Sequence, residues 1–145
     1  MNTATIEEAI DKYVSERMEQ GKERARAHFL AYAYLKNGGS EIKEFMKKAG
    51  GLARYYIDFL RVMENPFRGP EMAWLATMIV MGIFSCYLMG TEDQQLLGIL
   101  VFSGTLVHFC ALVRLVAKKW SDTGVMIAIY REIAEIADKE IASAA

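Results

Sequence analysis

The fold is decided by residues 72–113, which read MAWLATMIVMGIFSCYLMGTEDQQLLGILVFSGTLVHFCALV. The stretches 72–91 and 94–113 contain no Asp, Glu, Lys or Arg, and the acidic pair Glu92 and Asp93 separates them. A helix of about 20 apolar residues crosses a hydrocarbon core about 30 Å thick. Neither stretch has the polar stripe that is typical of a helix on a protein surface. The segment 71–119 therefore predicts an antiparallel transmembrane helical hairpin.

The pattern of apolar and polar residues in 1–64 predicts a cytoplasmic region of two amphipathic helices. The first is expected over 6–36, because a Thr5–Glu8 capping box precedes apolar residues at four-residue spacing. Gly21 is a weak point in this helix, and the glycines that follow Lys36 end it.

The second amphipathic helix is expected to begin after a Ser40 cap. It should continue through Gly50 and Gly51, since the 3.6-residue apolar period survives across them. Residues 65–70 contain both prolines of the chain and predict a linker. Pro70 suits the first turn of the next helix, where its missing N–H costs nothing.

Residues 120–145 predict a C-terminal amphipathic helix, which makes the whole chain all-α. Ser121 or Asp122 can cap this helix, so we expect a break between it and the second span. The alternative is one uninterrupted helix of about 50 residues, roughly 75 Å long.

Basic residues predict the orientation of the hairpin. Twelve Lys and Arg precede the first span, five follow the second, and the connection has none. Cytoplasmic loops carry the excess of Lys and Arg, and Trp is enriched at membrane interfaces. We therefore expect a multi-pass protein of the plasma (inner) membrane with both termini cytoplasmic. Its interface anchors are Trp74, Trp120, Arg114, Lys118 and Lys119.

His108 is the candidate cofactor-binding residue, since an ionisable side chain inside a span is costly and suggests a function. Gly104, Thr105 and Ala111 share its helix face, so it is expected to point at protein rather than lipid. The simpler interpretation is a neutral imidazole hydrogen-bonded to Thr77, Ser85 or a backbone carbonyl, in the hairpin or in a neighbouring subunit. Haem ligation, a quinone contact or a proton relay are the functional alternatives.

Small residues predict the surface through which the spans pack. In lipid, helices associate largely by close backbone approach at small residues. These residues either close the hairpin or face a second subunit. The predicted packing residues are Gly82, Cys86 and Gly90 in the first span and Gly98, Gly104, Thr105 and Ala111 in the second.

The sequence contains no enzyme motif, and we expect no catalytic residue, bound metal or cofactor. A net charge of -1 argues against a nucleic-acid partner. The leading hypothesis is a structural or assembly subunit that contacts the lipid bilayer and docks onto copies of itself or a larger membrane complex. The alternatives are an oligomeric pore lined by His108 or Thr105, a redox or quinone-site subunit using His108, and a soluble helical bundle.

Overall fold

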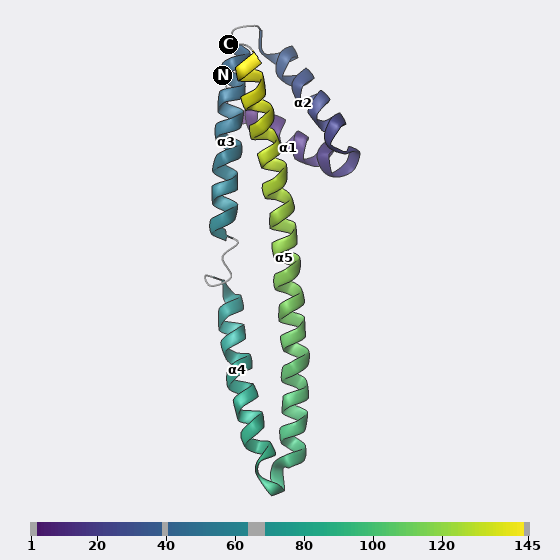
Figure 1. Ribbon diagram of the computed structural model, residues 1–145, viewed down its shortest axis with the longest axis vertical. Coiled ribbons are helices and arrows are strands. Elements are labelled where there is room, and N and C mark those ends of the chain that lie inside the picture. The colour runs from purple at the N-terminus through teal and green to yellow at the C-terminus, as the bar shows by residue number, and fades with distance from the viewer. Residues whose placement is uncertain (1–2, 39–40, 64–68, 144–145) are drawn as a thin grey trace. The chain divides into compact units, whose positions relative to one another are not determined.

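The computed structural model describes residues 3–38, 41–63 and 69–143, and every regular element in these ranges is helical (Figure 1), as predicted. The chain divides into two compact units, Val62–Thr123 and the combination of Met1–Arg61 with Gly124–Ala145. The last helix contributes to both units. The elements are α1 Thr3–Gln20, α2 Lys22–Lys36, α3 Glu41–Met63, α4 Pro70–Met89, the 3-10 helix η2 Glu92–Gln94 and α5 Gln95–Ser143.

The N-terminal region holds three helices, so the expectation of two is wrong. Gly21 separates α1 from α2 with φ +89, a left-handed conformation that glycine adopts without steric cost. The chain reverses there, and the ring of Tyr13 meets the ring of Phe29 edge-on at 5.6 Å between centroids. The Thr5 capping box is also wrong, because α1 already begins at Thr3.

Helices α1, α2 and α3 and the C-terminal part of α5 surround one apolar core, and we call this the four-helix unit. Helix α3 is continuous through Gly50 and Gly51, as predicted. Gly50 is where α3 approaches α5 closely, because an added Cβ would lie 3.1 Å from Cβ of Ala137. The largest fully buried hydrophobic side chains of this core are Ile6, Ile10, Tyr13, Phe45, Met46 and Ile133.

Helix α5 runs without a break from Gln95 to Ser143, so the predicted break at Ser121 or Asp122 is wrong. The cap-forming residues there stay inside the helix, and the Thr123 hydroxyl donates to the Lys119 carbonyl at 2.8 Å. The apolar period then resumes in the buried part of α5 that belongs to the four-helix unit. The alternative of one long helix is the observed one.

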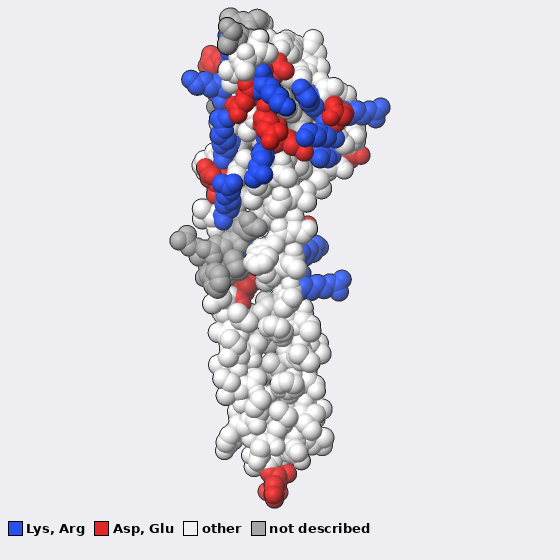
Figure 2. Space-filling model, viewed as in Figure 1, with Lys and Arg blue, Asp and Glu red and all other residues white. Residues whose placement is uncertain are grey.

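The other unit contains α4, η2 and the first part of α5, and we call α4, η2 and α5 up to Thr123 the hairpin. Pro70 occupies the first turn of α4, as predicted. The face of the hairpin seen in Figure 2 is free of charge along most of its length and ends in an acidic patch at the α4–α5 connection. The Ser40 cap and most of the 65–70 linker fall outside the described residues.

Candidate functional site

An ion pair joins the two helices of the hairpin at the end opposite the connection. Lys119 Nζ of α5 donates to Glu71 Oε1 of α4 at 2.8 Å. The Glu71 side chain is only 12% exposed, so the pair is shielded on its acidic side. Counting eleven residues into each helix from this pair, about 16 Å at 1.5 Å per residue, reaches Gly82 on α4 and His108 on α5. The ion pair therefore places these two residues at the same level.

The packing surface between α4 and α5 differs from the predicted one. Of the predicted packing residues, Gly98 is buried, Gly82 and Thr105 are half-buried, and Cys86, Gly90, Gly104 and Ala111 are exposed. The buried positions of α4 are instead Ser85 and Leu88. Residues at strict four-residue spacing turn about 40° further around the helix at each step, so they leave the contact surface. Alternating spacings of three and four residues follow it and would have been the better signal.

Gly98 fits where α5 begins because it has no side chain. An added Cβ would lie 2.6 Å from the backbone nitrogen of Met89 and 3.0 Å from the carbonyl carbon of Leu88. Carbon atoms of neighbouring residues do not approach backbone atoms this closely. The end of α4 and the start of α5 therefore contact each other directly through their backbones.

His108 is exposed on the surface of the hairpin, so within one chain it does not face the partner helix, and its contact with a neighbouring subunit stays a prediction. Gly104 and Ala111, which share its face, are exposed as well. The two hydroxyls proposed as its partners are engaged elsewhere, because Thr77 donates to the Ala73 carbonyl and Ser85 to the Gly82 carbonyl. Serine and threonine in helices often satisfy themselves in this way.

The predicted interface residues lie at the same end of the hairpin as the ion pair. Trp74 is half-buried and Trp120 is 47% exposed. Arg114 and Lys118 are exposed, and neither forms an ion pair within the described part of the chain. Within residues 3–38, 41–63 and 69–143, no three His, Cys, Asp or Glu side chains come together in a way that could hold a metal ion.

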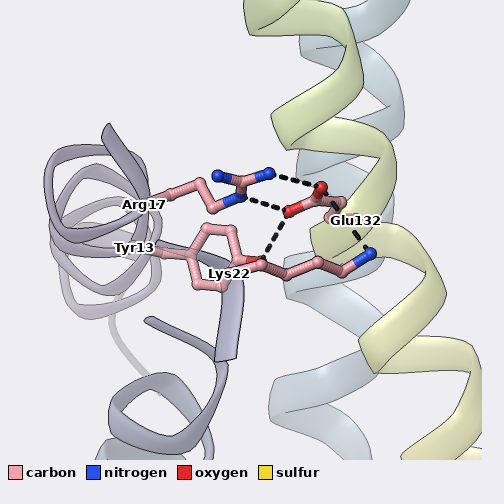
Figure 3. A network of polar contacts seen from close by, with 4 residues as sticks. All are labelled: Tyr13, Arg17, Lys22 and Glu132. Atoms are coloured by element: carbon pink, nitrogen blue, oxygen red, sulfur yellow. Dashed lines mark hydrogen bonds and ion pairs between the residues drawn. The ribbon is translucent and has the colours of Figure 1, made fainter. Parts of the chain in front are cut away.

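A second polar cluster lies in the four-helix unit and is centred on Glu132 of α5 (Figure 3). Its Oε2 accepts hydrogen bonds from Arg17 Nε at 2.9 Å and from the Tyr13 hydroxyl at 3.1 Å. Its Oε1 accepts one from Arg17 Nη2 at 3.2 Å, and Lys22 Nζ lies 3.7 Å away. The cluster ties α1 and the start of α2 to α5. The sequence alone does not reveal this cluster, because Glu132 is one of several charged residues on the polar side of an amphipathic helix.

Contacts within the Glu132 cluster shift the pKa values of Glu132 and Tyr13. The hydrogen bond from Arg17 holds the pKa of Glu132 below its usual range, against the opposing effect of burial. Burial raises the pKa of Tyr13 well above its usual value, and the negative charge of Glu132 adds to this effect. A carboxylate whose two oxygens already accept from cationic and phenolic donors has little capacity left to act as a general base. We interpret the cluster as structural.

The four-helix unit should lose stability in acid through Glu132. A depressed folded-state pKa contributes stability that is present above the unfolded pKa, about 4.3, and is lost as the pH falls through the folded value. Glu132→Gln should cost about 1–3 kcal/mol at pH 7 and flatten this acid dependence. Hydrogen exchange of α1 amides between pH 3.5 and 7 measures both effects. Glu44→Gln, in an exposed pair with Lys48, is the control and should change little.

Comparison with known proteins produced no match. No protein-family model, curated protein or solved structure matches the chain.

Proposed function

We propose that this chain is an integral membrane protein whose hairpin crosses the bilayer twice, and that it serves as a structural or assembly subunit. The observation that carries the proposal is the exposure of two long apolar helices. Pro70–Met89 and Glu92–Ser143 are long and apolar enough to span a membrane, yet only 11% of the most apolar stretch of each is buried. The core helix of a soluble protein would be mostly buried, whereas lipid covers such a surface without any protein contact.

The charges at the two ends of the hairpin support an orientation with both termini in the cytoplasm. Arg114, Lys118 and the Glu71–Lys119 pair lie at one end, and the acidic residues Glu92 and Asp93 lie at the other. Basic residues next to a span stay on the cytoplasmic side. The acidic connection would then face the outside.

The surface of the four-helix unit supports a docking role. Many apolar residues of its helices are buried against one another, whereas Met18 of α1, Leu35 of α2 and a short stripe on the last turns of α3 stay exposed. Tyr55 is 62% and Phe59 50% exposed, four residues apart on one face of the helix. We propose that this stripe contacts a second copy of the chain or a larger membrane complex.

The topology is testable by labelling intact cells. In a background with Cys86 and Cys110 replaced by alanine, Asp93→Cys should react with a membrane-impermeant maleimide from outside. Lys139→Cys should react only after the cells are made permeable. Equal labelling of the two sites before permeabilisation would contradict the proposed topology.

The assembly role is testable by mass measurement after gentle extraction from the membrane. The wild-type chain should be found as an oligomer or with a stoichiometric partner, and Phe59→Glu should release it as a monomer. Lys47→Glu, on the exposed polar side of the same helix, is the control and should leave the complex intact. A wild-type chain that is extracted as a monomer would rule out this role.

A further inference from the structure

An apolar groove lies between α4 and α5 in the half of the hairpin that carries the ion pair. Its cavity volume is about 360 Å³, within the range of small-molecule sites. Glu71 is the one charged residue on its wall, and one of its carboxylate oxygens is held by Lys119. The remaining walls include Leu75 of α4 and Phe109, Val113, Val116, Ala117 and Trp120 of α5.

The groove is long enough to hold much of one acyl chain within one leaflet of a bilayer. From Trp120 to Phe109 are eleven residues of a continuous helix, which is about 16 Å at 1.5 Å per residue. Half of a hydrocarbon core about 30 Å thick is about 15 Å. With Trp120 and Arg114 in the interfacial region, the groove extends from the headgroup level into the hydrocarbon of the same leaflet.

We propose that this groove binds one acyl chain of a phospholipid of the cytoplasmic leaflet. The inference rests on the proposed insertion of the hairpin into the membrane. A polar ligand would find only the Glu71 carboxylate as a partner on these walls, and each of its other polar groups would stay unpaired at a cost of several kcal/mol. An extended hydrocarbon chain has no such groups and is available around the whole hairpin. Trp120, which is amphipathic and exposed at the mouth, suits the level of the headgroup.

A helix from a second copy fits this groove less well than an acyl chain. Helices in membranes approach each other closely at small residues. The walls of the groove are bulky, with Leu75, Phe109 and Val113 among them, whereas the exposed Gly104 and Ala111 lie elsewhere on α5. A second hairpin would therefore find its closest packing on that other face.

The proposal is tested by filling the groove with larger side chains and counting the phospholipids that the purified protein retains. Full-length protein is reconstituted in liposomes of phosphatidylcholine and phosphatidylglycerol, extracted with mild detergent, washed and analysed by native mass spectrometry. Wild-type protein should retain a single phospholipid, and Ala117→Phe, which fills the groove, should retain none. Ala111→Phe makes the same substitution in the same helix outside the groove and should retain the lipid. Val113→Trp is a second filling variant in case the first is unstable.

Different outcomes would contradict the lipid site and the membrane insertion of the hairpin. Equal lipid retention in all variants, or loss in Ala111→Phe, would overturn the lipid site. So would disulfide-linked dimers through Ala117→Cys in a background without Cys86 and Cys110, because a second copy would then occupy the groove. Protein that alkaline carbonate strips from the liposomes would instead contradict membrane insertion itself.

Discussion

Replacing Gly98 with alanine should open the hairpin at its connection and destabilise it by about 1–3 kcal/mol, the usual range for a side chain forced into a packed site. The added Cβ would lie 2.6 Å from the backbone nitrogen of Met89 and 2.7 Å from its Cγ. A flexible side chain can move away, but the backbone of α4 can move only if the helix shifts. The midpoint of thermal denaturation in detergent should fall by about 5–10 °C.

Gly104→Ala is the matched control for this variant. Gly104 is also a glycine inside α5, but an added Cβ would meet nothing within 4 Å. Alanine favours helix over glycine, so this variant should be unchanged or slightly more stable. If Gly98→Ala and Gly104→Ala denature at the same temperature, α4 and α5 do not meet at Gly98.

The second large effect is expected in the four-helix unit. Phe45 of α3 has no exposed surface, and its ring lies 6.1 Å from that of Phe29 between centroids. Phe45→Ala removes a buried aromatic side chain and leaves a cavity, which typically costs about 3–5 kcal/mol. Because many domains have a total stability of about 5–15 kcal/mol, much of the stability of this unit should disappear.

Hydrogen exchange of the full-length chain in nanodiscs measures this loss by segment. Amides of α1, α2 and α3 should exchange much faster in Phe45→Ala, while those of α4 keep their protection. Leu35→Ala is the control in the same unit, since Leu35 of α2 is 87% exposed and its truncation leaves no cavity. Equal effects of the two variants would mean that Phe45 is not part of a packed core.

Local sequence determined the class of the protein and several of its helix boundaries. Two stretches without charge and a short acidic connection are sufficient to specify two adjacent apolar helices, each long enough to span a membrane. Pro70 opens α4, and the chain leaves the helical conformation at Asn37, as expected before two glycines. In α3 the apolar period outweighed the weak helix propensity of Gly50 and Gly51.

Only the tertiary structure decided which of these helices meet and through which face. A glycine such as Gly21 permits both a straight helix and a reversal, and the apolar faces of α1 and α2 select the reversal by burying each other. The same reasoning applies to α5, where Ser121 and Asp122 can end a helix but remain inside one whose apolar residues pack further on. The outward face of His108 and the partners of Glu132 depend on the rotation of one helix against another. The period of apolar residues in a sequence shows which residues share one face of a helix. The element that this face packs against is decided by contacts between residues that are distant in the chain.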